Sequence, residues 1–204
     1  MGIQDRKERD KLEMRKRIID AAMHMFTKEG YEHASIRKIA DKIEYSPATI
    51  YLYYKDKDEL LYDVQAECFS KLVDIFKREA NAPHPFTRLE QICRSYVQFG
   101  KNHAEMYDLM FIMKSPMNNV HEHENWQNAD DAFAYLAKTI AECMEQGLIK
   151  YDNLYLGALS VWAMGHGLVS LNIRCRMKVM DMTEEQTDDA INAAIEGYLS
   201  TIKK

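Results

Sequence analysis

Residues that break helices are scarce in this chain. Its 204 residues include 8 Gly and 4 Pro, whereas a fold of many small strands needs frequent turn residues. Apolar residues recur at helical spacing instead, as in the stripe formed by Ile18, Ala22, Met25 and Phe26. No strand-like alternation, internal repeat or low-complexity tract is present. We therefore predict an all-α fold of about nine helices.

Capping residues and breakers divide the chain into its expected helices. Ser35, Ser46 and Asp56 can each cap a helix start; Pro47 follows Ser46 at the favoured first position, and Glu59 stands three residues after Asp56. The helices are expected at residues 6–29, 35–43, 46–54, 56–79, 86–101, 103–113, 125–147, 153–176 and from 184 to the C-terminus. A polar loop is expected at residues 115–125.

The charge is unevenly distributed. The net charge is −5, but residues 1–57 carry +3 and residues 58–204 carry −8. Because the N-terminal segment is basic and the rest of the chain is acidic, any attraction for polyanions is confined to the N-terminal segment. The four Cys residues form no CxxC pair, which favours reduced thiols over a zinc site or disulfide framework. The charged N-terminus has no apolar stretch typical of an export signal, so we expect a cytoplasmic protein.

Two short capped helices between Ser35 and Tyr54, separated by a tight turn at Glu44–Tyr45, fit a helix-turn-helix. In the second helix, the phase directs Ile50 and Tyr54 into the core. Pro47, Ala48 and Tyr51 then lie on the opposite, outer face, which is small enough at its start to approach base edges.

The same region contains a longer set of matching residues, namely Arg17–Ala22, Phe26, Gly30–Tyr31, Ser35–Ala40, Ser46–Tyr51 and Tyr53–Leu60. With these residues it resembles the N-terminal domain of the TetR family of transcriptional regulators. The match covers residues 15–61 in order and without gaps. One departure is Glu44, because the family usually has Gly in the turn, where a positive φ is required.

The resemblance implies a homodimer whose two recognition helices enter successive major grooves of a palindromic operator, about 34–36 Å apart. It also implies dimerisation through the last two helices, for which Ala190, Ala194, Gly197 and Tyr198 are suited on the final one. We expect a DNA-binding domain at residues 1–57 and an effector-binding and dimerisation domain at residues 58–204.

The expected DNA contacts are unusual in chemistry. The predicted DNA-binding residues are Ser35, Arg37, Tyr45, Ser46, Pro47, Ala48, Thr49, Tyr51, Tyr53 and Lys57. The second helix lacks Arg, Lys, Asn and Gln, the main bidentate base readers, so hydroxyls and thymine-methyl contacts should replace them. Phosphate contacts should then dominate the affinity, which makes it strongly salt-dependent.

The alternative that the tyrosines are plain core residues is accepted for Tyr54. For the charged run 6–17, a solvated helix start is favoured over a DNA-seeking arm.

The segment Val161–Leu171 resembles a Trp–His–Gly signature of one type of C-terminal domain in such regulators.

Residues 153–173 carry no formal charge and are long enough to cross a bilayer. Asn153, His166, Asn172 and three Gly make this a poor membrane span, and we expect a helix buried on every side within the protein.

An effector pocket is expected among the middle helices, because Met and aromatic side chains form adaptable apolar cavities. Its candidate residues are Tyr96, Phe99, Met106, Met110, Phe111, Met113, Trp126, Phe133, Trp162 and His166. Each taken singly can also be an ordinary core residue. His166 needs a hydrogen-bond partner in an apolar helix, and an internal carboxylate or carbonyl is the expected one.

Other chemistry is not favoured. His121–Glu124 has a metal-like HxH spacing, but a solvated polar loop is the simpler interpretation. The chain has no GxSxG elbow, phosphate-binding Gly loop or HExxH motif, so we expect neither an enzyme nor a cofactor.

We therefore predict a transcriptional regulator, a repressor released from double-stranded operator DNA when a small, largely apolar effector binds. Tilting of the helix at 57–79 would change the spacing of the recognition helices. A DNA-binding structural or partner-controlled protein without an effector is the main alternative, and a membrane-attached regulator is the third.

Overall fold

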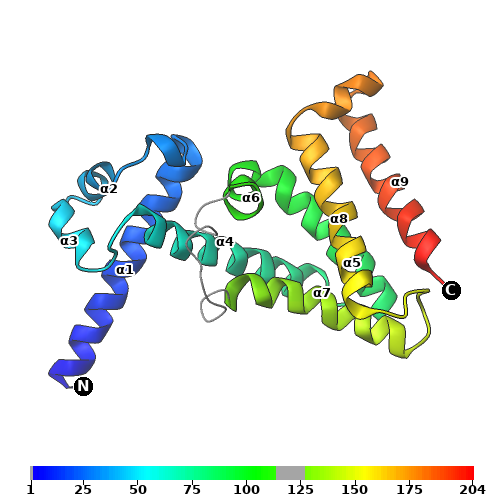
Figure 1. The fold of residues 1–204 in the computed structure, drawn as a ribbon, viewed down its shortest axis with the longest axis horizontal. Coiled ribbons are helices and arrows are strands. Elements are labelled where there is room, and N and C mark those ends of the chain that lie inside the picture. The colour runs from blue at the N-terminus through cyan, green and yellow to red at the C-terminus, as the bar shows by residue number, and fades with distance from the viewer. Residues whose placement is uncertain (1, 114–126) are drawn as a thin grey trace. The chain divides into compact units, whose positions relative to one another are not determined.

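The structure, a computed structural model of the chain, describes residues 2–113 and 127–204. These residues form nine α-helices, two short 3-10 helices and no strand, with a single isolated bridge between Ile149 and Lys203 (Figure 1). The elements are α1 (Ile3–Lys28), η1 (Tyr31–His33), α2 (Ile36–Lys42), α3 (Pro47–Tyr51), α4 (Lys57–Glu79), α5 (Pro85–Asn102), α6 (Ala104–Phe111), α7 (Gln127–Glu145), α8 (Leu154–Ile173), η4 (Arg176–Met180) and α9 (Glu184–Ile202). The predicted all-α fold is confirmed.

The chain divides into two compact units. The first contains residues 2–68 with the described residues 108–113, and the second contains residues 69–107 with the described residues from 127 onward. Helices α4 and α6 each contribute to both units. The first unit thus includes the beginning of α4 in addition to the predicted DNA-binding domain 1–57.

The first unit is organised around the buried stripe of α1. The stripe contains Ile18, Ala22, Met25 and Phe26, all at most 4% exposed. The predicted caps of the next two helices are confirmed: Ser35 Oγ accepts from Lys38 N at 3.3 Å, and Ser46 Oγ accepts from Thr49 N at 3.3 Å. These caps satisfy amides that have no partner within their own helix.

The start of α4 is also capped, with one difference from the expected pattern. Asp56 Oδ1 accepts from Glu59 N at 2.8 Å. Glu59 Oε2 accepts from Lys55 N at 2.6 Å, one residue earlier than in a standard capping box. The side chain therefore ties the end of the helix-turn-helix to α4.

The second unit is built around α5, which packs against α7, α8 and α9. Large apolar residues from all four helices fill its core, among them Leu89, Ile140, Val169 and Ile195. Helices α5 and α8 approach so closely at Gly100 that an added Cβ would lie 2.8 Å from Val169 Cγ2 and closer still to Cγ1. Only Gly fits this crossing without a shift of its neighbour.

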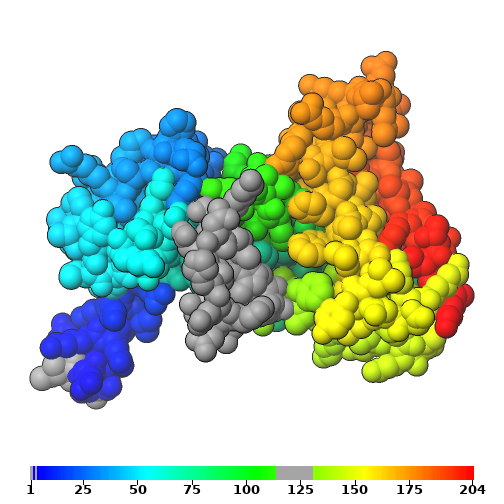
Figure 2. Space-filling model, viewed as in Figure 1, coloured from blue at the N-terminus to red at the C-terminus, as the bar shows by residue number. Residues whose placement is uncertain are grey.

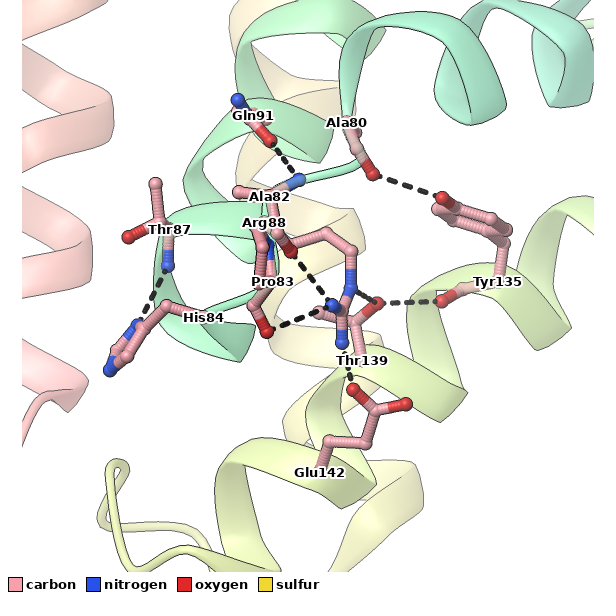
Figure 3. A network of polar contacts seen from close by, with 10 residues as sticks. All are labelled: Ala80, Ala82, Pro83, His84, Thr87, Arg88, Gln91, Tyr135, Thr139 and Glu142. Carbon is pink, nitrogen blue, oxygen red and sulfur yellow. Dashed lines mark hydrogen bonds and ion pairs between the residues drawn. The ribbon is translucent and has the colours of Figure 1, made fainter.

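A polar network that the sequence did not suggest holds the α4–α5 connection (Figure 3). Arg88, whose side chain is 15% exposed, forms an ion pair with Glu142 and donates to the Ala82 carbonyl oxygen at 2.8 Å. Tyr135 Oη donates to the Ala80 carbonyl oxygen at 2.9 Å. Backbone carbonyls that follow α4 thus receive their hydrogen bonds from side chains of α5 and α7.

The expectation that residues 153–173 are buried on every side is wrong for the single chain. Among the described residues, α8 is the one helix long and apolar enough to cross a membrane. Only 28% of the residues in its apolar 18-residue stretch are buried. Its buried stripe contains Gly157, Ala158, Val161, Gly165 and Val169. Its exposed large apolar residues are Tyr155, Leu156, Leu159, Trp162 and Leu171. Figure 2 shows α8, in yellow to orange, at the surface of the second unit, because its neighbouring helices cover only one side.

The close α5–α8 crossing predicts that the effect of Gly100→Ala on stability changes sign when Val169 is made smaller. Gly100→Ala should lower the free energy of unfolding by about 1–3 kcal/mol through overpacking against Val169, which exceeds the helix-propensity gain of ~1 kcal/mol. In a Val169→Ala background, the same substitution should raise stability because the new methyl group fills vacated space. Urea denaturation of the four proteins measures both effects, and stabilisation in both backgrounds would contradict the close approach.

Candidate functional site

The second helix of the helix-turn-helix has one buried and one exposed face, as predicted. Ile50 is 0% exposed and Tyr54 is 2% exposed. On the other side, Tyr51 is 55% exposed and Ala48 is exposed as well. The inner face anchors α3 while the outer face remains available for a partner.

The turn between α2 and α3 adopts the conformation expected for a Gly, although Glu44 occupies it. Glu44 has φ 63°, in the left-handed region that non-Gly residues rarely adopt. Its N–H donates to Asp41 O at 3.1 Å, and Tyr45 N donates to Ala40 O at 3.0 Å. The departure from the family pattern therefore leaves the turn closed and leaves some backbone strain in it.

Tyr45 follows the turn and is held by α1. The Arg17 guanidinium carbon lies 5.2 Å from the centroid of the Tyr45 ring, a cation–π contact. Arg17 also donates to the Ile43 carbonyl oxygen at 3.4 Å. Tyr45 remains 38% exposed, so its ring is oriented by Arg17 while its edge stays accessible. No local pattern in the sequence predicts this role of Arg17.

The other predicted DNA contacts lie along the helix starts and the exposed side of this unit. Ser35 and Arg37 are exposed, and Ser46 Oγ lies 3.1 Å from Thr49 Oγ1 at the start of α3. Pro47, Thr49 and Tyr53 are half-buried. The region between Ser46 and Tyr54 therefore displays hydroxyl and apolar groups, with no Arg, Lys, Asn or Gln side chain.

Lys57 forms hydrogen bonds within the protein, and these limit its availability to a phosphate. Its Nζ donates to the carbonyl oxygens of Tyr31 at 2.8 Å and Ala34 at 3.2 Å. The ammonium group also lies 4.0 Å from the Tyr31 ring centroid. One of its three donors is left for another acceptor, so any phosphate contact depends mainly on the charge of Lys57.

A polar triad supports the inner face of α3. Tyr54 Oη donates to Asp63 Oδ2 at 2.7 Å, while Arg15 Nε lies 2.9 Å from Asp63 Oδ2 and 3.2 Å from Tyr54 Oη. Burial, together with the hydrogen bond to Asp63, raises the pKa of Tyr54 above its usual value. Tyr54 was expected to be only a core aromatic residue, yet its hydroxyl joins α1, α3 and α4.

Leu52 is the functional candidate that the sequence analysis missed. It is 80% exposed and directly follows α3 with helical backbone angles of φ −73° and ψ −16°. The signal was available, because Leu52 stands four residues after Ala48 and so shares its outer face.

A second polar cluster lies in the second unit, among side chains from α5, α6 and α8. Tyr107 Oη lies 2.6 Å from His166 Nδ1 and 3.2 Å from the His166 carbonyl oxygen. Tyr96 Oη lies 3.5 Å from His166 Nδ1 and accepts from Trp162 Nε1 at 3.4 Å. Aromatic and polar contacts are thus combined around one imidazole.

The surroundings of His166 favour its neutral form. Burial lowers the pKa of His166, and the positive charge of Arg174 lowers it further. A carboxylate or a carbonyl oxygen was the expected partner of this imidazole, whereas the ring Nδ1 contacts the Tyr107 hydroxyl, 2.6 Å away. A hydroxyl can either donate to the imidazole or accept from it, which suits a ring that carries no charge.

The structure brings together only part of the predicted effector site. Phe133 and Trp162 form an edge-to-face pair with centroids 6.3 Å apart, which adds Phe133 to the cluster of Tyr96, Trp162 and His166. Phe99 is buried and packs against His103. Met106 is half-buried, Met110 is buried, and Phe111 and Met113 are half-buried. Trp126 and the loop His121–Glu124 lie outside the described residues.

The predicted dimer residues differ in exposure. Ala194 and Gly197 are exposed on α9, whereas Ala190 and Tyr198 are half-buried. Tyr198 Oη lies 3.2 Å from Tyr151 Oη, so its polar end is engaged within the chain. A Cβ built at Gly197 meets no atom within 4 Å. Small side chains on α9 therefore border open space.

Nothing in the described part of the chain groups three or more His, Cys, Asp or Glu side chains as a metal site would require. Cys68, Cys93 and Cys143 are buried free thiols, and Cys175 is an exposed one.

Family models match both units of the chain. Residues 18–64 match the model described as "Bacterial regulatory proteins, tetR family", and residues 89–198 match the "Tetracyclin repressor-like, C-terminal domain". The second match alone covers more than half of the chain. This chain belongs to the TetR family.

Individual relatives agree with the TetR assignment. An uncharacterized HTH-type transcriptional regulator of Haemophilus influenzae is 28% identical over 135 residues, or 65% of this chain and 64% of its own length. The HTH-type transcriptional repressor KstR of Mycobacterium tuberculosis is 38% identical over 78 residues, or 38% of this chain and 36% of its own length. These two matches therefore span less than two thirds of each curated relative.

A solved structure extends the agreement in fold to nearly the whole chain. A TetR family transcription regulator of Marinobacter aquaeolei VT8 superposes with a TM-score of 0.70 at 20% identity, covering 97% of this chain and 99% of its own. The TetR architecture is thus shared even where the sequences have diverged.

The strained TetR turn makes a testable prediction. Glu44→Gly should raise the free energy of unfolding by up to ~1 kcal/mol, because relief of the left-handed strain outweighs the entropy cost of Gly. It should also tighten binding to duplex DNA because it removes a negative charge near the phosphates. Urea denaturation and fluorescence anisotropy measure the two effects.

The matched control is Glu44→Gln, which removes the charge but retains the backbone strain. It should reproduce the gain in DNA affinity without the gain in stability. Equal stabilisation by Gln and Gly would show that φ at this position is not strained.

The neutral His166 predicts a pH dependence of stability. A lowered pKa means that the unfolded state takes up a proton first, near pH 6.5. The His166 contribution to stability should therefore be complete above that pH and lost as the pH falls below it. His166→Asn, which keeps a polar group near Tyr107 but does not titrate, should lose less stability than the original protein between pH 7.5 and 5.5. Parallel urea titrations that gave identical losses would contradict a lowered pKa of the half-buried His166.

Proposed function

We propose that this TetR-family chain is a transcriptional regulator that binds a palindromic operator as a homodimer. The observation that carries the proposal is the exposed outer face of a correctly capped helix-turn-helix, whose inner face is anchored by Ile50 and Tyr54. The net charge of +3 on residues 1–57 supports attraction to DNA. The name of the KstR relative, a transcriptional repressor, supports repression as the mode of regulation.

The proposed DNA contacts are divided by their chemistry. Phosphates are bound by the hydroxyls or charges of Ser35, Arg37, Tyr51, Tyr53 and Lys57. The bases are approached by Tyr45, Ser46, Pro47, Ala48 and Thr49. The phosphate-binding set positions the protein on the duplex but reads no sequence. Because bidentate base readers are absent from α3, phosphate contacts contribute most of the affinity.

The proposed dimer interface is formed by α8 and α9. The exposed apolar side of α8, including Leu156 and Leu159, is large for a face left in water. Gly167 on α8 and Gly197 on α9 have no atom within 4 Å of a built Cβ, so a partner helix can approach both. Such an interface would cover the apolar outer side of α8 without a membrane, which supports a cytoplasmic location.

The proposed effector site surrounds His166. Tyr96, Tyr107, Phe133 and Trp162 offer aromatic surface with a few directed polar groups, the combination typical of small-molecule sites. Phe99, in the same unit, remains a predicted contributor to this site. Met110 and Met113 belong to the first unit and Trp126 lies outside the described residues, so these three stay predictions from the sequence alone. The Trp162–His166–Gly167 resemblance to the Trp–His–Gly type of C-terminal domain supports the same location. A largely apolar effector that prefers the DNA-free state would release the operator, and a hundredfold release needs a coupling of about 2.7 kcal/mol.

A regulator without a small effector is the second candidate. The contacts between Tyr107 and His166 and between Trp162 and Tyr96 already satisfy polar atoms inside the cluster. A core that is complete in this way favours control by a partner protein instead. Neither candidate requires catalysis, a cofactor or a metal.

Selection of bound sequences from a random DNA pool, at two salt concentrations, tests the central proposal. We expect a palindrome with half-sites about one helical turn apart and a steep loss of affinity with salt. Tyr51→Phe should weaken binding of this operator several-fold through loss of one phosphate contact. Lys138→Ala, at an exposed position on α7, is the matched control and should leave binding unchanged. No enriched sequence, or equal losses in both variants, would overturn the proposal.

A further inference from the structure

We propose that Leu52 is a specificity-determining residue that contacts thymine methyl groups of the operator. The inference rests on the proposed DNA-binding function and adds to it the chemistry by which α3 distinguishes bases. No other side chain of the α3 outer face combines such exposure with such apolar surface, because Leu52 is 80% exposed and its neighbour there, Ala48, carries only a methyl group.

The position of Leu52 follows from the helical phase of α3. Ile50 and Tyr54 define the buried side, at 0% and 2% exposure. At 100° per residue, Leu52 points about 180° away from the mean direction of these two side chains. Its backbone angles remain helical although α3 ends at Tyr51, so the phase still holds. Leu52 therefore lies at the centre of the outer face, next to Ala48 four residues earlier.

The chemistry of this face points to a methyl group as its partner. Residues 46–54 contain no amide, guanidinium or ammonium side chain, so the bidentate contacts that identify guanine and adenine are not available there. Thymine is the base that presents a methyl group in the major groove, and apolar side chains recognise it by contact. Burial of Leu52 against such methyl groups removes apolar surface from water on both partners.

The neighbours of Leu52 favour DNA over a protein as the occupant of this face. Tyr51, the last residue of α3, and Tyr45, just before its start, are exposed aromatic residues whose hydroxyls can form phosphate contacts on either side of this face. Lys55 is exposed three residues further along, and the surrounding segment 1–57 is net positive. An apolar centre within a positive, hydroxyl-bearing surface is complementary to a thymine-containing major groove.

The test combines a protein variant with a base analogue, in the operator obtained by selection. Single thymines are replaced by uracil, which lacks only the methyl group, and binding is measured for the original protein and for Leu52→Ala. At the contacted thymine, the original protein should lose about fourfold in affinity, the value of one buried methyl group. Leu52→Ala should bind the unmodified operator about tenfold more weakly and should be almost insensitive to uracil at that position. Such a loss of sensitivity identifies direct coupling between the side chain and the methyl group.

Leu12→Ala is the matched control, because Leu12 on α1 is also a highly exposed leucine, at 66%. It should change neither the affinity nor the uracil effect. Both substituted side chains are largely solvated, so the variants should unfold at the same urea concentration as the original protein. This separates a lost contact from a lost fold.

Each outcome has one meaning. If uracil weakens both proteins equally at every position, or if Leu52→Ala binds the operator as well as the original protein, Leu52 does not read methyl groups and the inference is overturned. If Leu52→Ala binds more weakly but no uracil position distinguishes the two proteins, Leu52 contacts the backbone or another protein surface, and the inference is again overturned. Failure of the selection to yield any operator would instead overturn the proposed DNA-binding function.

Discussion

The burial of Ile50 and Tyr54 within the core of the first unit is the interaction on which the DNA-binding surface depends. Because α3 is only five residues long, it has little intrinsic stability and is held by its contacts. The Tyr54 hydroxyl extends this anchor by its hydrogen bond to Asp63, which Arg15 also binds. Once the inner face is fixed, the helical phase alone places Ala48, Tyr51 and Leu52 outside.

The second unit follows a different physical constraint, which is one-sided burial. Gly100 allows α5 to lie close to α8, and the buried stripe of α8 is made mainly of small residues. The opposite side of α8 is left exposed and apolar, which a single chain in water does not favour. Dimerisation through this side would remove that surface from water, and it would make the stability of the second unit depend on protein concentration.

Much of the fold and part of the candidate site could be predicted from local patterns. Caps at Ser35, Ser46 and Asp56 and the two-sided phase of α3 are encoded within a few residues, and all of them were found. Leu52 is absent from the predicted DNA-binding residues, although its spacing of four from Ala48 indicates the same outer face. The contact between the His166 ring and the Tyr107 hydroxyl could not be predicted, since the two residues are 59 positions apart and no local rule pairs them.

The sequence by itself determined the helical class, the starts of the capped helices, the family and the sidedness of α3, because each depends on residues close together in the chain or on a continuous motif. Only the tertiary structure decided which side of α8 stays exposed, which hydroxyl contacts the His166 ring and how Lys57 and Tyr54 are used. These features depend on packing between helices far apart in sequence. A periodic pattern shows that a face is apolar, but only the neighbouring helices decide whether that face is covered.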